Sequence, residues 1–439
     1  MPATEPLSTS TSPLDDDALR ASSFRKASLR LIPLLAFGYC AAYIDRVNIS
    51  FAALQMNRDL HFSATIYGFG AGLFFLSYAA CEVPSNLLLF RFGARRWLAR
   101  IMFTWGILAI GMMFVRTPIH FYVMRFLLGM AEAGFFPGVI FYLGQWFPAA
   151  TRARAVSRFY ISMPLSSVVM GVLAGALLKL QGTLGLAGWQ WLFLVEGLPP
   201  LILGIAFLLL LPDGPADASW LTSAERTWLL HQLQHDTSSP GHHESIATAL
   251  RDRRVWLLSL LFFCVLTCNY AYTFSAPAIL QAATSLGSSA VGFLIAAIGL
   301  LGAIAMVLNA MHSDRSGERT WHIAAPCLLM AAAFAVAGVA HAALIVVPAL
   351  ALSAIAFFAL QGPVWAIPAT FLKGRPAAAG IAVINMIAIL GGFAGPYWMG
   401  RARDLTGNYQ RGLLTLAIPA IGSGAVILFM NRARPSSTA

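Results

Sequence analysis

Apolar runs long enough to cross a lipid bilayer recur along this chain from about residue 30 onward. They form two blocks, separated by a polar stretch of roughly forty residues. The predicted membrane spans are 30–54, 64–89, 97–115, 120–146, 155–178 and 189–211 in the first block, and 254–281, 288–312, 321–341, 344–369, 377–400 and 411–431 in the second. The pattern predicts an all-α polytopic membrane protein, with about twelve transmembrane helices arranged as two six-helix halves.

The polar segments indicate how the chain is divided. The expected parts are a disordered cytoplasmic N-terminal tail (1–27), an N-terminal six-helix bundle (28–211), a cytoplasmic linker (212–253), a C-terminal six-helix bundle (254–431) and a cytoplasmic C-terminal tail (432–439). Inside the linker, Thr222 and Glu225 have the spacing of a capping box, and Trp228, Leu229 and Leu230 follow them. This pattern predicts a short amphipathic helix on the cytoplasmic face.

Composition and charge support a membrane protein. Of the 439 residues, 58% are hydrophobic and 11% are charged, whereas soluble domains are about a quarter charged. The formal net charge of +11 comes from short basic clusters in alternate loops, such as Arg95-Arg96. By the positive-inside rule this distribution places those loops and both termini in the cytoplasm, although Arg401 and Arg403 go against it. Such clusters do not indicate a nucleic-acid partner.

Neither the cysteines nor the histidines predict a metal site. The five cysteines fall inside apolar segments and show no metal-binding or disulfide spacing: Cys40, Cys81, Cys264, Cys268 and Cys327. Four linker histidines have no cysteine beside them and are interpreted as solvated side chains: His231, His235, His242 and His243. The sequence also lacks a nucleotide-binding loop, which disfavours ATP-driven transport.

One apolar segment, Phe121 to Trp146, carries two charged residues, Arg125 and Glu132. Placing an ionisable group at membrane depth costs roughly 2.5–3.5 kcal/mol on the insertion scale. The two residues are about two helical turns apart and therefore share a helix face. That face is expected to line a polar cavity rather than to contact lipid, with Asp45 and Arg46 of the first segment as partners.

The two halves show traces of an internal repeat. A short basic motif recurs at an offset of about 224 residues (315 minus 91), as Arg91-Phe-Gly93-Ala-Arg95 and as Arg315-Ser-Gly317-Glu-Arg319. The same offset relates Gly171 to Gly395. These matches predict two bundles related by an axis normal to the membrane.

Five short motifs occur in a characteristic order. They are Asp45-Arg46-Val-Asn48, Glu82-Val-Pro84-Ser85-Asn86, Arg125-Phe-Leu-Leu-Gly129-Met-Ala-Glu132, Trp189-Gln-Trp191-Leu-Phe-Leu-Val-Glu196-Gly197 and Ala310-Met-His-Ser-Asp314-Arg315-Ser-Gly317. The last resembles the loop signature Gly-x-x-x-Asp-Arg-x-Gly of the major facilitator superfamily. The first half departs from that signature, with Asn86 for the glycine and Phe90 for the aspartate. The whole set resembles the anion:cation symporter branch of that family.

The resemblance implies a multi-pass carrier of the bacterial inner membrane that imports an organic anion with protons, as galactonate, tartrate and phthalate-type carriers do. It implies that Asp45 and Glu132 handle the coupling protons and that Arg46 binds the anion. Arg125 would bind substrate too, or hold Glu132. Arginine suits the anion because it stays charged and its planar fork fits a carboxylate. Carboxyl groups suit the protons because desolvation raises their pKa and a nearby arginine lowers it.

Further polar and aromatic residues are candidates for the substrate cavity, because they can hydrogen-bond hydroxyl groups or flank a ring: Tyr43, Tyr78, Asn269, Tyr270, Trp365 and Asn385. Tyr78, Trp365 and Asn385 fall where, by resemblance, this family contacts substrate. Two other carboxyl groups are expected to be structural. Glu82 precedes Pro84, and Glu196 is expected near a helix end.

The sequence therefore predicts a proton-coupled secondary transporter, not an enzyme. It would carry a sugar acid, a tartrate-like acid or an aromatic acid by alternating access of its two halves. Its partners would be the small anion and the lipid bilayer, with protons but no cofactor, and the family default is a monomer. Two alternatives stay open: a membrane enzyme using the buried Asp/Glu/Arg cluster, and an anion exchanger or uniporter without proton coupling.

Overall fold

A computed structural model describes residues 13–160, 162–237, 250–368, 371–372 and 374–432. The α-helices there are α1 (Pro13–Asp59), α2 (Ala64–Phe92), α3 (Ala94–Gly111), α4 (Pro118–Glu132), α5 (Phe135–Gly144), α6 (Ala149–Tyr160), α7 (Ser162–Leu177), α8 (Gly188–Leu210), α9 (Ser223–Thr237), α11 (Arg253–Thr284), α12 (Ser288–Ser316), α13 (Thr320–Val339), α14 (Ala343–Ala366), α15 (Gly374–Thr406) and α16 (Gln410–Arg432). Short 3₁₀ helices lie at Met112–Phe114, Leu178–Leu180, Thr183–Gly185 and Pro215–Asp217. These residues contain no strand, so the all-α prediction is confirmed.

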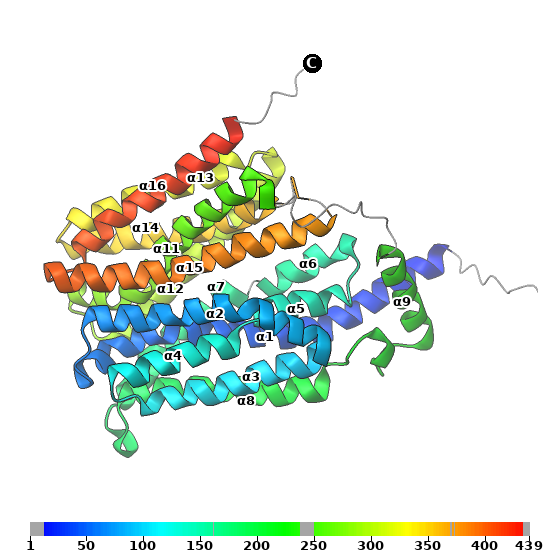
Figure 1. Cartoon of the computed structure of the whole chain (residues 1–439), viewed down its shortest axis with the longest axis horizontal. Helices are drawn as coiled ribbons and strands as arrows, with labels where there is room; N and C mark the ends of the chain where they lie inside the picture. Colours follow the sequence, from blue (N-terminus) through cyan, green and yellow to red (C-terminus); the bar gives the residue numbers. More distant parts are fainter. Residues whose placement is uncertain (1–12, 161, 238–249, 369–370, 373, 433–439) are drawn as a thin grey trace, which may run out of the picture.

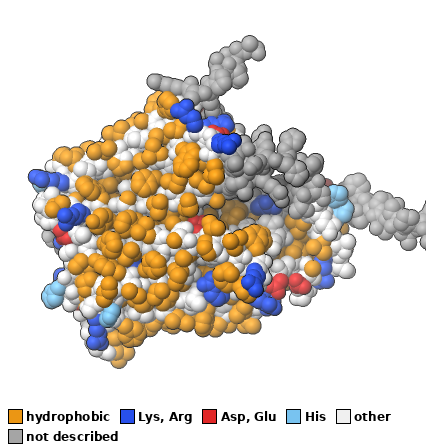
Figure 2. Space-filling view, in the orientation of Figure 1, with side chains coloured by type: hydrophobic (Ala, Val, Ile, Leu, Met, Phe, Trp, Pro, Cys, Tyr) orange, Lys and Arg blue, Asp and Glu red, His pale blue; other side chains and the backbone are white. Residues whose placement is uncertain are grey.

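Within the described ranges, 11 helical segments are long and apolar enough to cross a membrane. The remaining predicted span, 155–178, includes residue 161, which lies outside the described residues; α6 and α7 lie on either side of it, and the shorter apolar helix found there is Leu165–Leu180. The count of 11 therefore does not contradict the predicted twelve. On the face shown in Figure 2, hydrophobic side chains cover the middle of the molecule and Lys and Arg gather toward its ends. This is the surface of a multi-pass membrane protein.

The expected disordered tail is wrong for residues 13–27, which form the first turns of α1. Tertiary contacts with α9 explain this helix. Lys26 Nζ and Ser22 Oγ donate hydrogen bonds to the Glu225 carboxylate at 2.8 and 2.5 Å. The ring of Phe24 packs on that of Trp228, with centroids 5.6 Å apart. A polar segment that looks disordered in isolation is thus ordered by its partner helix.

Helix α9 lies where the sequence indicated a linker helix, and its capping box is formed. The Glu225 amide donates to Thr222 Oγ1 at 3.3 Å, and the Thr222 amide donates to Glu225 Oε2 at 2.8 Å. Burial raises the pKa of Glu225, but the hydrogen bonds from Lys26, Ser22 and Thr222 outweigh it and lower the pKa to about 2. The carboxylate is therefore charged at neutral pH and holds α9 against α1. His242 and His243 lie outside the described residues.

The two halves meet along three helix pairs: α2 with α15, α7 with α12, and α1 with α11. Exchanging the halves exchanges α2 with α12 and α15 with α7, which is the pairing expected of a parallel repeat. The repeated basic motifs lie at the ends of two equivalent helices, α2 and α12. Each helix ends at the glycine of its motif, Gly93 with φ +83° and Gly317 with φ +66°. The end of the bundle on the right of Figure 1 is here called the terminal face. It contains the start of α1 and the whole of α9.

The end away from the terminal face, here called the opposite face, is closed by contacts between the halves. Asp404 of α15 accepts hydrogen bonds from the Ala64 and Thr65 amides of α2, at 3.1 and 2.7 Å. Ser289 Oγ of α12 donates to the Gly175 carbonyl of α7 at 2.5 Å. Gly171 allows the closest approach of α7 to α12, since a Cβ there would lie 2.4 Å from the Gly292 carbonyl oxygen.

Replacing Asp404 with Asn is expected to loosen this closed end. The carboxylate satisfies two free amides at the positive end of α2, and such caps are worth about 1 kcal/mol. The ratio of closed to open molecules should fall about fivefold. Distances between spin labels at Leu184 and Leu344, both highly exposed on the opposite face, would report it. As a control, Asp314→Asn removes a charge from an exposed pair with Arg319 and should leave the label distances unchanged. Equal distance distributions in the two variants would show that Asp404 does not hold this end closed.

Candidate functional site

The charged segment predicted as one helix is broken directly after Glu132. Helix α4 ends at Glu132, and α5 starts at Phe135 after Gly134, whose φ is +87°. The break frees the Ala133 carbonyl, which accepts a hydrogen bond from Ser85 Oγ of α2 at 2.6 Å. A Cβ at position 134 would lie 2.3 Å from Ser85 Oγ, so this contact requires glycine. Glu132 thereby becomes the last residue of a helix inside the membrane.

Arg125 and Glu132 both lie on the buried face of α4, as predicted. Glu132 forms an ion pair with Arg46 of α1. The negative end of α4 disfavours a carboxylate there, and the Arg46 guanidinium offsets that cost. The side chain of Arg46 keeps 12% of its surface exposed, whereas Glu132 keeps 1%. Arg46 is therefore the partly accessible member of the pair, and Glu132 is the buried one.

Aromatic rings surround the Arg46 guanidinium. Its Cζ lies 5.4 Å from the centroid of Phe74 and 5.3 Å from that of Tyr78, both on α2. Tyr270 of α11 also lies within electrostatic reach of Arg46, and its ring packs on Phe75 at 4.3 Å. Ring faces attract a cation, which helps to keep the guanidinium charged at membrane depth. This cluster joins the two halves.

Asp45 is buried next to Arg46, but its hydrogen-bond partners lie outside the Arg46–Glu132 pair. Its carboxylate accepts hydrogen bonds from Trp105 Nε1 of α3 at 2.9 Å and from Asn48 Nδ2 at 3.3 Å. The expected partnership of Asp45 with Arg125 is electrostatic only, since no ion pair joins them among the described residues. Trp105 was not anticipated, although a buried indole N–H needs an acceptor and could have pointed to one.

Arg125 is fully buried and closed off from the space between the halves. Its guanidinium lies 4.9 Å from the Phe74 centroid and donates one hydrogen bond, to the Ala71 carbonyl at 3.3 Å. Its Nε and Nη1 atoms have no hydrogen-bond partner. In this conformation Phe74 lies against both guanidiniums, and Arg46 is the accessible one.

A cavity of about 1000 Å³ extends from the halves' interface to the terminal face. Glu82 of α2 and Asn385 of α15 line it and contact each other across the interface, with Asn385 Nδ2 3.1 Å from Glu82 Oε1. The Glu82 carboxylate is also within electrostatic reach of Arg46. Trp365 lines the same cavity and packs on Phe262, with ring centroids 4.4 Å apart. Glu82, expected to serve the backbone near Pro84, instead bridges the two halves.

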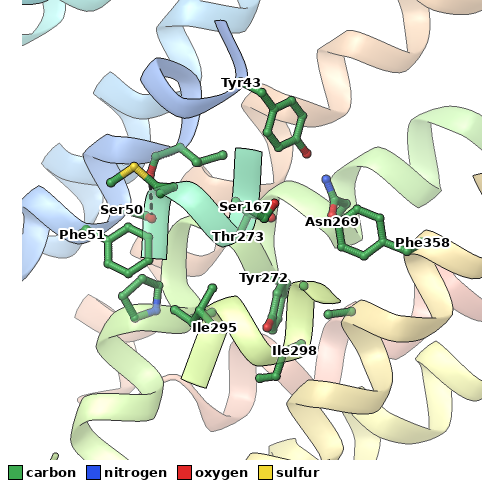
Figure 3. A pocket seen from close by; sticks show the side chains of 16 residues that line it. Tyr43, Ser50, Phe51, Ser167, Asn269, Tyr272, Thr273, Ile295, Ile298 and Phe358 are labelled. Atoms are coloured by element: carbon green, nitrogen blue, oxygen red, sulfur yellow. Dashed lines mark hydrogen bonds between the residues drawn. The ribbon is translucent and has the colours of Figure 1, made fainter. Parts of the chain in front are cut away.

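A second, much smaller cavity of about 50 Å³ lies between the halves and contains Tyr43 and Asn269 (Figure 3). Tyr272, Ser50 and Phe358 also line it. This volume admits a few water molecules but not an organic acid. Tyr43 and Asn269 therefore do not share the large cavity with Trp365 and Asn385 in this conformation.

The structure thus groups the predicted site residues in three places. The first group is the Arg46–Glu132 ion pair, with Tyr78 and Tyr270 near Arg46. Trp365 and Asn385 line the large cavity, and Tyr43 and Asn269 line the small one. Arg125 and Asp45 are buried behind the first group. A single sequence identifies these residues by type, but which of them share a cavity depends on the packing of the two halves.

Comparisons with known proteins agree with this architecture. Residues 35–396 match the family model of the Major Facilitator Superfamily. A protein of Agrobacterium vitis named "Putative tartrate transporter" is 45% identical over 420 residues, covering 95% of this chain and 93% of that protein. The "Quinolone resistance transporter" of Acinetobacter baumannii is 39% identical over 396 residues, covering 90% of this chain and 91% of that protein.

A solved structure supports the fold independently. The bacterial homologue of the human lysosomal transporter Spinster, in an inward-facing and occupied conformation, superposes with a TM-score of 0.76. It shares 16% sequence identity, and the match covers 93% of this chain and 98% of that one. The family model, the close relatives and the shared helical fold therefore lead to the same conclusion. This chain belongs to the Major Facilitator Superfamily, and it is a membrane transporter rather than an enzyme.

Proposed function

We propose that this transporter moves an organic carboxylate together with protons. The observation that carries the proposal is the Arg46–Glu132 ion pair, which joins a partly accessible guanidinium to a buried carboxyl group between the two halves. An intramembrane charge is costly and is by default functional. A tartrate-like hydroxy acid is the favoured substrate, because the close relative from Agrobacterium vitis bears a tartrate name.

The proposed coupling is an exchange of partners on Arg46. While Glu132 is charged, it occupies the guanidinium; when Glu132 takes a proton, the pair weakens and Arg46 is free to bind the carboxylate of the substrate in its planar fork. Asp45, one residue earlier on α1, is the second proton-binding group. Substrate and proton are then bound together, which is the condition for symport.

The large cavity serves as the path to one side of the membrane. By the positive-inside rule the terminal face is cytoplasmic, since α6 and the loops on that side carry the arginine clusters. The molecule is then open to the cytoplasm of a bacterial inner membrane and closed at its opposite face. Alternating access would close the Glu82–Asn385 side and open the Asp404 side.

Export of an aromatic acid is the second candidate, and it rests on the relative named for quinolone resistance. An exchanger or uniporter without proton coupling would use the same Arg46 site but would not need Asp45. These candidates differ in direction and in their dependence on a proton gradient. Both properties are measurable with one preparation.

Uptake into proteoliposomes, with and without an inward proton gradient, tests the proposal. The panel is tartrate, galactonate, glucarate, phthalate, 4-hydroxyphenylacetate and a quinolone carboxylic acid. We expect one acid, with tartrate first, to accumulate and to leak out again when a protonophore is added. Saturable exchange that ignores the gradient would support the uncoupled alternative. If the quinolone alone moves, and it leaves the vesicle lumen as protons enter down their inward gradient, the result would support the exporter.

Neutralising either proton-binding group is expected to abolish accumulation. Asp45→Asn and Glu132→Gln should each reduce uptake to the level seen without a proton gradient, because each removes one of the two carboxyl groups that the coupled cycle needs. Glu132→Gln should keep substrate-for-substrate exchange, since Arg46 is then permanently released. Asp314→Asn, which alters an exposed carboxylate of the second half, serves as the control. Full accumulation by both site variants would exclude these two residues from coupling.

Arg46→Lys is expected to weaken substrate binding while the protein still folds. A lysine keeps the charge but loses the bidentate fork, and one hydrogen bond between charged groups is worth about 1.5–3 kcal/mol. The dissociation constant of the transported acid should rise about tenfold or more. Isothermal titration in detergent would measure it, with Arg315→Lys as a matched control outside the site. Unchanged binding in Arg46→Lys would move the anion site to Arg125.

A further inference from the structure

Glu196 does not lie near a helix end, as the sequence suggested, but is buried inside α8 with 3% of its surface exposed. Neither of its carboxyl oxygens has a hydrogen-bond partner. The groups that act on it are the Asn48 amide and the Asp45 carboxyl of α1. A carboxylate buried without a cation or a donor is unstable, and such a group becomes neutral instead.

Counting the buried charges of the N-terminal half leads to the same result. Leaving out Glu82, which lines the large cavity, three buried carboxyl groups, on Asp45, Glu132 and Glu196, lie with the buried guanidinium of Arg125 and the partly exposed guanidinium of Arg46. If all were ionised, the sum would be minus one (two minus three). Glu132 is paired with Arg46, and Arg125 acts electrostatically on Asp45. Glu196 is the carboxyl group that no arginine compensates.

The Asn48 amide places a proton at this position. Its Nδ2 donates to Asp45, while its Oδ1 is buried and lacks a donor. A protonated Glu196 would supply that donor, and one proton would then pair Asn48 Oδ1 with one of the two Glu196 oxygens. The position of the proton follows from this orientation of the amide, because an amide between two carboxyl groups offers a donor to one and an acceptor to the other. Asp45 also receives the Trp105 N–H at 2.9 Å, which favours the charged form at Asp45 and the proton at Glu196.

We propose that Glu196 is a resident neutral acid that positions the proton-coupling site. Its O–H donates to Asn48 Oδ1, which holds Asn48 Nδ2 toward Asp45, so that of these two carboxyl groups Asp45 exchanges a proton during transport and Glu196 keeps its own. The role of Asp45 in this statement rests on the proposed function; the proton on Glu196 does not. Glu196 is thus a positioning residue, acting on Asp45 through Asn48.

Among the described residues, the helices packed on α8 bring no other group that acts on Glu196. α8 packs against α1, α3 and α7, and against the short helices Met112–Phe114 and Leu178–Leu180. α1 contributes Asp45 and Asn48, and α3 contributes Trp105 and, near its start, Arg95, Arg96 and Arg100. None of those arginines acts on Glu196. Among the described residues of α7 and the two short helices, Lys179 is the one ionisable side chain, and it does not act on Glu196 either.

Infrared spectroscopy of the protein in lipid tests the proton directly and needs no transport. We expect the wild type at neutral pH to show the C=O band of a protonated, slowly exchanging carboxylic acid, and Glu196→Gln to lose it. Asp45→Asn and Glu225→Gln should keep the band. Persistence of the band in Glu196→Gln, or its loss in Asp45→Asn instead, would overturn the assignment, as would a wild type without the band.

A pair of variants tests the positioning role. Glu196→Gln offers an N–H to Asn48 Oδ1 in place of the acid O–H, whereas Glu196→Leu fills similar space without a donor. The pH midpoint of uptake should stay unchanged in Glu196→Gln and rise by about half to one pH unit in Glu196→Leu, because Asn48 is then free to turn away from the charged Asp45.

Identical pH profiles for the two variants would show that Glu196 only fills space. A variant that does not fold is recognised by its thermal denaturation, and Glu196→Met then replaces Glu196→Leu. Absence of uptake by the wild type would refute the proposed function but leave the infrared result to decide the protonation of Glu196.

Discussion

A buried ion pair is stable only while its partners stay together, because separating them leaves an uncompensated charge in a poorly polarisable medium. Arg46 and Glu132 are in this situation at the centre of the molecule. Whatever weakens the pair must supply a replacement: a proton for Glu132, or another carboxylate for Arg46. In the proposed mechanism the cluster would therefore couple three events, namely protonation, anion binding and rearrangement of the guanidinium. The surrounding helices bury the cluster, so that only a proton on Glu132 or another carboxylate on Arg46 can replace the ion pair.

The break between α4 and α5 shows how the fold enforces this limit. A continuous helix would bond the Ala133 carbonyl internally and carry Glu132 in mid-helix, where nearby backbone groups are neutral. Ending α4 at Glu132 adds the negative end of the helix to the carboxylate and increases its need for a cation. Ser85 and Gly134 make that ending possible. Two motifs that looked independent in the sequence thus form one structural unit.

The sequence was sufficient for features that depend on local pattern and failed for those that depend on partners. Membrane spans, the Thr222–Glu225 capping box and the shared face of Arg125 and Glu132 follow from hydropathy and helical period. The helical start of α1 could not be foreseen, since its polar residues are ordered by α9. Nor could the Glu82–Asn385 contact, because its members are 303 positions apart on different halves. Periodicity tells which face a residue occupies, not what lies against it.

The distribution of charge between the halves suggests why such a molecule can change shape at all. Among the described buried residues, the charged ones near the interface belong to the N-terminal half, whereas the C-terminal half buries only neutral polar groups such as Asn269 and Gln361. Sliding a neutral surface past fixed charges breaks no ion pair, so the electrostatic cost of rocking is small. The contacts that do cross the interface, Glu82 with Asn385 and Asp404 with the α2 amides, are hydrogen bonds worth about 0.5–3 kcal/mol each. Interactions of that size are weak enough for bound ligands to shift the balance between the two ends, and this balance, more than any single residue, is what the proposed alternating access would require.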